Sequence, residues 1–387
     1  MNKFLSQKLF SSFQLFTGLF LLIAKPICAV TLPVPDHIVI CILENHGYSQ
    51  IIGSTAAPYI NSLASAGASF GASYALTHPS QPNYIMLFSG SNQGVTTDNT
   101  ATNTPWSTLN LGSSLINSGH TFTAYSQSLP SVGSTVTTSG AYARKHAPWV
   151  NWQGTGTNRI PAISNQPFTS FPTNFSTLPT VSFVIPDMNH DMHNGTDPSR
   201  ITTADTWVQI NLNSYITWAN THNSLFILTF DENDNSSGNQ IATIFTGQMV
   251  QPGYYNTITY NHYNILRTVE NMYGLPYAGA SSAVQTILEC WINTSGIMEP
   301  DASIKFSVDP NPVSTTASFH SSGIINFSNA RFLVYDILGN VARDLSKEFD
   351  EQKGNMLFNR EGLKSGIYFY RLTDGNELFF TGKMVIE

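Results

Sequence analysis

The sequence predicts an α/β fold, a doubly wound sheet with helices on both faces, followed by a small C-terminal antiparallel β-sandwich. Up to about residue 300, continuous apolar runs end in polar clusters, as buried parallel strands with a ligand site at their carboxyl ends do. From about Lys305, short alternating runs separated by turn residues indicate antiparallel strands instead. This change of pattern predicts two domains of different architecture.

The first expected strand is His37–Leu43, where the apolar residues are continuous rather than alternating. The polar residues Glu44 and Asn45 follow it directly, so we expect them at the carboxyl edge of the sheet. A helix is expected at Pro58–Ala66, with Gly67 ending it.

A polar segment at 77–84 leads into a helix-like stretch at 85–90. If Ser80 caps this helix, its hydroxyl faces the positive end of the helix dipole and free N–H groups, where a phosphate oxygen would bind. A serine alkoxide would still need a cation to form at neutral pH. A plain helix cap is the alternative for Ser80 alone, and the coincidence of several polar clusters favours the chemical interpretation.

Two further buried strands are expected at Val181–Ile185 and Ser224–Phe230, and each also ends in a polar cluster, at 186–193 and 231–234. Parallel strands end at one edge of a sheet, so these clusters indicate one shared site. Hard oxygen ligands suited to a divalent cation are available at the strand ends, namely Glu44, Asn45, Asp231 and Glu232.

Three histidines are further candidates. His190 and His193, with Asp187, offer a mixed nitrogen and oxygen set for a second metal or for the phosphate, and a solvated loop is the alternative. His262 precedes an amphipathic helix that reaches Tyr273, and a cap or surface group is the alternative for this residue.

The basic residues of the first domain are few: five bases stand against thirteen acids between residues 30 and 300. Arg144, Lys145 and His146 form the basic cluster of this region, which could steer an anionic substrate, with an exposed turn as the alternative. An arginine cradle can hardly be the main device for holding phosphate here.

The composition excludes several classes of protein. Charged residues make up 11% of the chain, whereas about 25% is usual. This excludes a disordered polyampholyte, a coiled coil and a nucleic-acid binder with a basic face.

Residues 1–29 are predicted to be a cleavable secretory signal peptide, since lysines precede an apolar stretch at 15–24 and small residues end the segment. The apolar stretch is too short to span a bilayer, and no later segment is apolar enough. A lipoprotein cysteine at Cys28 is the alternative. In an oxidising compartment Cys41 and Cys290 could form a disulfide, although a buried thiol is equally natural for Cys41.

Five ordered motifs, within roughly residues 36–295, resemble the bacterial phosphoesterase family of acid phosphatases and phospholipases C, which belongs to the alkaline phosphatase superfamily. The motifs lie at 43–46, 77–90, 142–146, 187–193 and 229–232. The resemblance implies an alkaline-phosphatase-like doubly wound sheet and a phosphate-ester substrate.

The resemblance also implies roles for residues. Ser80 would be the phosphorylated nucleophile, Asn83 would contact a phosphate oxygen, and His190, His193 and His262 would contact the phosphate, a second metal or the leaving group. The expected substrate-binding set is Asn83, His78, Arg144, Lys145 and His146. The expected metal-binding set is Glu44, Asn45, Ser80, Asp231, Glu232 and Asp187, for a divalent ion such as Ca, Zn, Mg or Mn.

Two departures from the superfamily narrow these expectations. Sulfatases need Cys or Ser followed by x-Pro-x-Arg, and here Tyr84 follows Asn83, so sulfate-ester cleavage is not expected. The pair Glu44 and Asn45 replaces the Asp of two-zinc alkaline phosphatases, which leaves the number and identity of the metals open.

The C-terminal region, about residues 303–387, resembles the sorting domain of type IX secretion cargo through motifs at 306–313, 334–340 and 363–371. The resemblance implies contact with the type IX secretion machinery, export across the outer membrane and a secreted or surface location. A carbohydrate-binding sandwich is the alternative.

The sequence thus predicts three segments: a signal peptide at 1–29, a phosphoesterase domain at 30–300 and a sorting domain at 301–387. The expected function is a secreted, metal-dependent phosphomonoesterase that works through a phosphoserine. A phospholipase C or other phosphodiesterase is the first alternative, and a non-catalytic surface binding protein on the same fold is the second.

Overall fold

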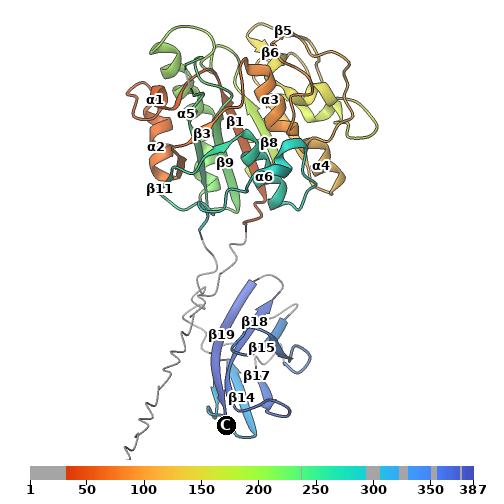
Figure 1. Cartoon of the computed structure of the whole chain (residues 1–387), viewed down its shortest axis with the longest axis vertical. Helices are drawn as coiled ribbons and strands as arrows, with labels where there is room; N and C mark the ends of the chain where they lie inside the picture. Colours follow the sequence, from red (N-terminus) through yellow and green to blue (C-terminus); the bar gives the residue numbers. More distant parts are fainter. Residues whose placement is uncertain (1–31, 237, 293–305, 322–329, 350–354, 375–376) are drawn as a thin grey trace, which may run out of the picture.

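The computed structural model describes residues 32–236, 238–292, 306–321, 330–349, 355–374 and 377–387 (Figure 1). The expected signal peptide lies outside these residues, as does the expected domain boundary at 300, so both stay predictions. In the described part of the chain, no helix is both long enough and apolar enough to cross a membrane.

The first domain is built on an eight-stranded sheet whose centre carries the predicted strands. Strand β1 (His37–Leu43) pairs in parallel with β8 (Val181–Ile185) on one side and with β9 (Ser224–Phe230) on the other. All three predicted strands are confirmed with the predicted bounds. The prediction succeeds because these strands are covered on both faces, and such strands need apolar residues at every position.

The remaining strands extend this sheet in the order β11-β2-β10-β9-β1-β8-β4-β7. Strand β10 runs antiparallel to β9, so the sheet is mixed rather than purely parallel. The outer strands are β2 (Ala68–Phe70), β4 (Phe122–Ser126), β7 (Asn165–Pro167), β10 (Thr243–Gly247) and β11 (Tyr254–Asn256).

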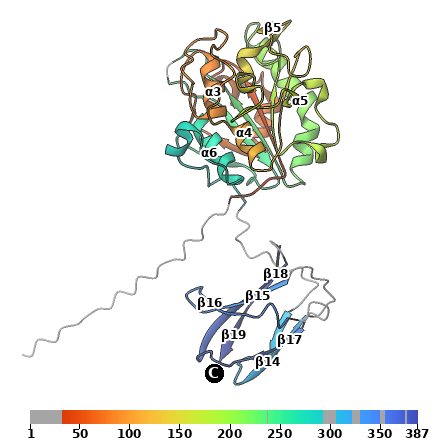
Figure 2. The same ribbon diagram turned by 90° about the vertical axis from the view of Figure 1, so that its right-hand side faces the viewer.

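Helices cover both faces of the sheet, as predicted. Ile38, Ile40 and Ile42 of β1 belong to one apolar core, and Val39, Cys41 and Leu43 belong to another. Figure 2 shows α3 and α6 on one side of the sheet and α5 on the other. The first core includes residues of α3 (Ser80–Ser89), α4 (Leu111–Asn117) and α6 (His262–Met272), and the second includes residues of α1 (Tyr48–Ile51), α2 (Pro58–Ala66) and α5 (Ser199–Ala219).

Short elements complete the domain. Two small sheets are formed by β3 (Ser73–Tyr74) with β12 (Tyr260–Asn261) and by β5 (Thr138–Ser139) with β6 (Tyr142–Ala143). The 3-10 helices are η1 (Arg144–His146), η2 (Pro148–Trp152), η3 (Ala162–Ser164), η4 (Phe168–Ser170), η5 (Phe175–Thr177) and η6 (Gly279–Ala283).

Helix boundaries agree with the sequence in part. The helix α2 has the predicted bounds, with Gly67 at its C-cap. The prediction for α3 was wrong in its start: the helix begins at Ser80 itself, and Pro79 is the N-cap residue. Likewise, His262 is the first residue of α6, because Asn261 provides the capping side chain by accepting from the N–H of Tyr263.

The two cysteines are free thiols in this structure, and both are buried. Cys41 belongs to the core beneath α2 and α5, whereas Cys290 belongs to the core on the opposite face of the sheet. Because the sheet separates them, the disulfide that the sequence permits does not form.

The C-terminal domain contains two antiparallel sheets, as predicted, with the orders β13-β14-β17 and β16-β15-β18-β19. Phe319 of one sheet packs against Phe332 and Tyr370 of the other, with ring centroids 5.0 and 4.9 Å apart. The strands are β13 (Phe306–Asp309), β14 (Thr316–Ser321), β15 (Ala330–Tyr335), β16 (Val341–Asp344), β17 (Asn355–Asn359), β18 (Gly366–Asp374) and β19 (Glu377–Ile386).

Candidate active site

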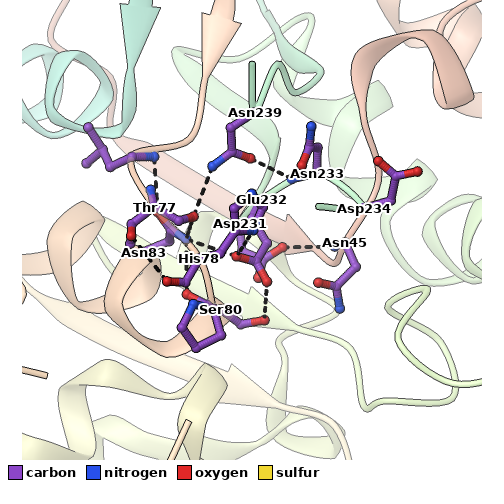
Figure 3. Close-up of polar contacts among 12 residues, drawn as sticks. Asn45, Thr77, His78, Ser80, Asn83, Asp231, Glu232, Asn233, Asp234 and Asn239 are labelled. Carbon is purple, nitrogen blue, oxygen red and sulfur yellow. Dashed lines mark hydrogen bonds and ion pairs between the residues drawn. The ribbon is translucent and has the colours of Figure 1, made fainter. Parts of the chain in front are cut away.

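The candidate site lies where β1 and β9 end side by side. Leu43 and Phe230 are register partners, so the next residues, Glu44 and Asp231, emerge together at the carboxyl edge of the sheet. The N–H of Asn45 donates to Oδ1 of Asp231 at 3.0 Å, which ties the two strand ends together (Figure 3). The sequence prediction that these ends share one location is therefore confirmed by the register.

Ser80 lies between the two strand ends. Its Oγ is 3.1 Å from Oε2 of Glu44 and 3.2 Å from Oε1 of Glu232. As the first residue of α3, Ser80 also lies at the positive end of that helix dipole. The Ser80 hydroxyl has one hydrogen, so it can donate to one of these two carboxylates at a time. Whichever way the hydroxyl is turned, a carboxylate oxygen lies within hydrogen-bond distance.

Asn45 completes this group. Its Nδ2 donates to Oε2 of Glu44 at 2.9 Å. Its backbone has φ of 52°, in the left-handed region that asparagine tolerates better than most residues. The sharp turn after β1 therefore depends on the residue type that the sequence provides at position 45.

The carboxylates of this group are buried, with 0% of Glu44, 1% of Asp231 and 3% of Glu232 exposed. Burial, together with the charges of Glu44 and Glu232, raises the pKa of Asp231 well above its ordinary value. Burial and the charge of Glu44 raise the pKa of Glu232 to about 8. In addition, Oδ2 of Asp231 is buried without a hydrogen-bond partner. Buried negative charge is costly unless a cation or protons neutralise it, so these oxygen ligands fit a divalent metal ion.

A second group of potential ligands shares Glu44. Nε2 of His146 lies 3.1 Å from Oε1 of Glu44, and Nδ1 lies 3.3 Å from Oδ2 of Asp191. Neither contact is a well-formed hydrogen bond, because Nε2 of His146 and Oδ2 of Asp191 are buried without partners. Glu44, His146 and Asp191 each offer a ligand atom within 4.8 Å of the others, so this buried cluster could hold a metal ion.

Burial also shifts the pKa values of His146 and Asp191 in this second group. Burial lowers the pKa of His146 to about 4, which keeps the imidazole neutral with a free lone pair. Burial raises the pKa of Asp191 to about 7. Tyr84 stacks on the His146 ring at 5.0 Å between centroids and donates to Oε1 of Glu44 at 2.6 Å, which orients both residues.

His78 and Asn83 border Ser80 from the same loop. Nδ1 of His78 is 2.7 Å from Oε2 of Glu232. The Asn83 amide bonds to the backbone, accepting from the N–H groups of Leu76 and Thr77 and donating to the carbonyl of Thr77. In this structure, Asn83 therefore shapes the loop that presents Ser80, and its contact with a phosphate oxygen stays a prediction.

The side chains of the predicted basic cluster, Arg144, Lys145 and His146, do not lie together in the structure. Lys145 points toward the site, with Nζ 2.7 Å from Oδ2 of Asp98 and 3.4 Å from Nε2 of His193. Arg144 points elsewhere and donates to the carbonyl of Thr135 and to Oδ1 of Asn151. The three residues predicted to bind substrate together thus have three different environments.

His190 and His193, which were predicted to act together, have different neighbours in the structure. His190 is paired with Asp187 at 2.7 Å, and Asp187 accepts a further hydrogen bond from Ser128 at 2.6 Å. His193 instead lies near Lys145, and its ring is 6.1 Å from that of His146.

His262 lies beneath the site rather than in a solvated cap. Its Nε2 donates to the carbonyl of Phe230, the residue before Asp231, at 2.9 Å. Burial lowers its pKa to about 4, so the ring is neutral, and Nδ1 has no hydrogen-bond partner among the described residues.

Several residues at the site were not singled out by the sequence analysis as ligands or contacts. Asp191 belongs to a polar cluster that was noted, so its position after a buried strand was an available signal. Asp98 lies in a polar loop without periodicity, and nothing in the sequence indicated that it reaches Lys145. Asn239 accepts from the N–H of Asn233 and donates to the carbonyl of Thr77, which joins two loops of the site (Figure 3).

A doubly wound sheet with a buried serine among carboxylates at its carboxyl edge suits a hydrolase that acts on phosphoric ester bonds. The chain belongs to the phosphoesterase family, whose model matches residues 54–276. This confirms the expected family and enzyme class.

Two relatives are named phosphatases. A phosphatidylinositol-3-phosphatase of Mycobacterium tuberculosis is 45% identical over 267 residues, which cover 68% of this chain and 86% of that protein. An acid phosphatase of Aspergillus fumigatus is 29% identical over 275 residues, which cover 67% of this chain and 59% of that protein. Among solved structures, an alkaline phosphatase superfamily protein of Vibrio parahaemolyticus has a TM-score of 0.49 at 11% identity and covers 75% of this chain and 76% of that chain.

The C-terminal region also matches a family model. Residues 307–387 match the secretion system C-terminal sorting domain, which confirms the expected export module. A sorting domain of this kind implies export to the cell surface or beyond it.

Proposed function

We propose that this protein is a metal-dependent phosphomonoesterase in which Ser80 is the nucleophile and a phosphoserine is the intermediate. The observation that carries the proposal is the position of Ser80. Its hydroxyl lies within hydrogen-bond reach of two buried carboxylates, at the positive end of α3. A nucleophile with an adjacent proton acceptor and a nearby helix N-terminus suits attack on a phosphate ester.

In this mechanism Oγ of Ser80 attacks phosphorus in line with the leaving oxygen. The hydroxyl proton passes to Oε2 of Glu44. Oε1 of Glu232 is also in reach, but burial and Glu44 raise the pKa of Glu232 to about 8, which leaves it mostly protonated at neutral pH. The Oγ–P bond forms while the bond from phosphorus to the ester oxygen breaks, and the departing alkoxide takes up the proton that Ser80 gave to the carboxylate and leaves as the alcohol. Water then cleaves the phosphoserine, which restores the hydroxyl and releases phosphate.

The residues that would hold the metal are those with oxygen ligands around Ser80, and the ion would supply Lewis-acid stabilisation of the alkoxide and the phosphate oxygens. The first set is Glu44, Asn45, Ser80, Asp231 and Glu232. The cluster of Glu44, His146 and Asp191 is a candidate for a second ion. By contrast, Asp187 is already bonded to His190 and Ser128, so we place it outside the first set.

A lipid-borne phosphate is a specific form of this substrate. One relative is named phosphatidylinositol-3-phosphatase, and its 45% identity to this chain favours a phosphate monoester on a lipid over a phosphodiester. Phospholipase C activity is the alternative within the same enzyme class, and a non-catalytic binding protein is the alternative outside it.

A substrate panel tests the proposal. Purified protein is assayed on p-nitrophenyl phosphate, phosphatidylinositol 3-phosphate, bis-p-nitrophenyl phosphate and phosphatidylcholine, with metal analysis of the same preparation. We expect cleavage of the two monoesters and loss of activity after chelation. Cleavage of only the two diesters would contradict the monoesterase proposal, and inactivity of the metal-loaded protein on all four would favour the binding protein.

We also propose that residues 1–29 direct the chain across the inner membrane and that the sorting domain is then recognised by the type IX secretion machinery. The first step is supported by the sequence pattern of residues 1–29 and the second by the family match of residues 307–387.

A further inference from the structure

An ion pair between Lys145 and Asp98 lies at the edge of the site. Nζ of Lys145 is bonded to Oδ2 of Asp98 at 2.7 Å, and the Lys145 side chain is 17% exposed. The same Nζ is 3.4 Å from Nε2 of His193. The ammonium group therefore stands between the loop that carries Asp98 and the loop after β8.

Asp98 is fixed to the residue next to the nucleophile. Its Oδ1 accepts from the backbone N–H of Gln81 at 3.0 Å, in the first turn of α3. The Gln81 side chain is buried and donates to the carbonyls of Thr97 and Asn99, on either side of Asp98. These three hydrogen bonds hold Asp98, and through it Lys145, at a set position relative to Ser80.

Lys145 is the basic side chain that the structure brings to this site. The other Lys and Arg residues described between 32 and 292 are four arginines. Arg144 bonds to Thr135 and Asn151, Arg200 pairs with Asp197, Arg267 stacks on Tyr277, and Arg159 lies in the loop between η2 and η3. Lys145 directly precedes His146, whose Nε2 lies 3.1 Å from Oε1 of Glu44. A lysine ammonium is charged at neutral pH.

A single cation at this place matters because of the charge of the substrate. A phosphate monoester carries nearly two negative charges at neutral pH, since its second pKa is about 6, whereas a diester carries one. The monoester also has three non-bridging oxygens, and a diester has two. Surrounding carboxylates repel the additional charge, so a lysine ammonium with three donors would favour the dianion.

We propose that Lys145, held in position by Asp98, contacts the additional non-bridging oxygen of a phosphate monoester and makes this site prefer monoesters over diesters. The inference rests on the proposed function at Ser80 and adds the residue that sets the substrate class. In it, Lys145 touches substrate, and Asp98 is a positioning residue that acts through Lys145.

The decisive experiment compares two substrates in one variant. For Lys145→Met, kcat/KM on p-nitrophenyl phosphate should fall about 10- to 100-fold, the range expected when a charge-assisted hydrogen bond is lost. On bis-p-nitrophenyl phosphate, the fall should stay under about threefold, the size of a screened surface charge effect. Arg267→Met is the matched control, because it removes an equal charge from a side chain that stacks on Tyr277 and donates to the carbonyls of Ser281 and Ser282. Its ratio of monoester to diester activity should equal that of wild type.

The role of Asp98 needs its own measurement. Asp98→Asn keeps the shape but removes the charge that holds Lys145, so the ratio should shift in the same direction by a smaller factor. In the double variant Asp98→Asn/Lys145→Met, the ratio should equal that of Lys145→Met alone, because Asp98 acts through Lys145. An additional shift in the double variant would overturn the positioning role.

Two outcomes would overturn the proposal for Lys145: an equal loss on both substrates, or no loss on either. Lys145→Arg keeps the charge and should restore part of the monoester preference, and it replaces Lys145→Met as the test if that variant does not fold. Ser80→Ala separates this proposal from the function on which it rests. If Ser80→Ala loses both activities, Ser80 is supported as the nucleophile, whatever the result for Lys145. If Ser80→Ala keeps activity, Ser80 is not the nucleophile, and the ratio of monoester to diester activity in Lys145→Met can still be measured.

Discussion

At the scale of single residues, Ser80 connects the helix α3 to the strand ends. Its Oγ is close to both Glu44 and Glu232, and the side chain is 2% exposed. In the proposed mechanism this hydroxyl is the nucleophile, so its removal is the direct test.

Ser80→Ala should lower kcat on p-nitrophenyl phosphate by about 10³-fold or more, as loss of a covalent nucleophile does. The measurement is a steady-state assay at saturating substrate. Ser65→Ala is the control, since Ser65 is exposed on α2 and donates only to the carbonyl of Asn61. Activity in Ser80→Ala comparable to that of Ser65→Ala would contradict a phosphoserine.

The buried carboxylates predict how the metal-free protein responds to pH. Glu232 has an ordinary pKa of 4.5 and a folded pKa of about 8, raised by burial and by Glu44. The folded state then binds more protons than the unfolded state, so stability is highest below the unfolded pKa and falls as the pH rises through the folded pKa. The Tm of chelator-treated protein should accordingly be lower at about pH 8.5 than at about pH 5.5.

Two comparisons check this pH effect. Glu232→Gln should reduce the drop in Tm, because the variant no longer has that carboxyl to ionise. Adding the divalent metal should raise the Tm most at high pH, since metal ligands must be deprotonated. A Tm of the metal-free protein that rises over this pH range would contradict the charge arrangement.

At this scale, the sequence predicted part of the site. The proximity of Glu44, Asp231 and Ser80 follows from strand ends and a helix start, which leave local signals. The division between Lys145 and Arg144 could not be predicted, because adjacent side chains of a 3-10 turn diverge according to tertiary contacts.

At the scale of elements, α3 is fixed at both ends. Its first residue belongs to the site, and its C-cap Gly90 has φ of 67° and lies against the segment that follows α6. A Cβ at Gly90 would lie 1.8 Å from the carbonyl oxygen of Ala278. The helix can approach that segment closely because position 90 has no side chain.

Gly90→Ala should destabilise the protein by about 2–4 kcal/mol, because it combines backbone strain at positive φ with a steric clash. Gly94→Ala is a matched control: its φ is 78°, but a Cβ there would meet nothing within 4 Å. The control should cost about 1–2 kcal/mol, the strain alone. Urea unfolding midpoints of the two variants provide the comparison, and equal shifts would contradict the close packing.

Among the strands of the large sheet, three that are buried on both faces were predictable from the sequence. The strands β1, β8 and β9 are covered on both faces, and their apolar runs give their bounds directly. The long helix α5 was not anticipated, because its exposed positions carry Thr, Asn and Ser rather than charged helix formers. The antiparallel direction of β10 depends on the chain path after β9, which leaves no local pattern.

At the scale of the whole molecule, the two domains have separate apolar cores. The cores on either face of the large sheet contain residues up to Trp291, and the third contains residues from Val313 onward. All of the site residues discussed above lie in the first domain. The contrast in charge between the two regions agrees with this division.

A chain that lacks residues 307–387 should keep the kcat and KM of the full chain, because the described site and its supporting cores lie before that point. In a host with type IX secretion, the same deletion should abolish delivery to the surface. Loss of activity in the purified, folded truncated protein would contradict the independence of the first domain.

The two free cysteines have a practical consequence. Cys41 and Cys290 are each 0% exposed and lie in cores on opposite faces of the central sheet. Burial also raises the pKa of both thiols, which suppresses the reactive thiolate. A thiol reagent can therefore modify each cysteine only when its own face of the sheet opens. The rates of labelling at the two positions would report, within one unmodified protein, whether the two layers of helices detach together or one after the other.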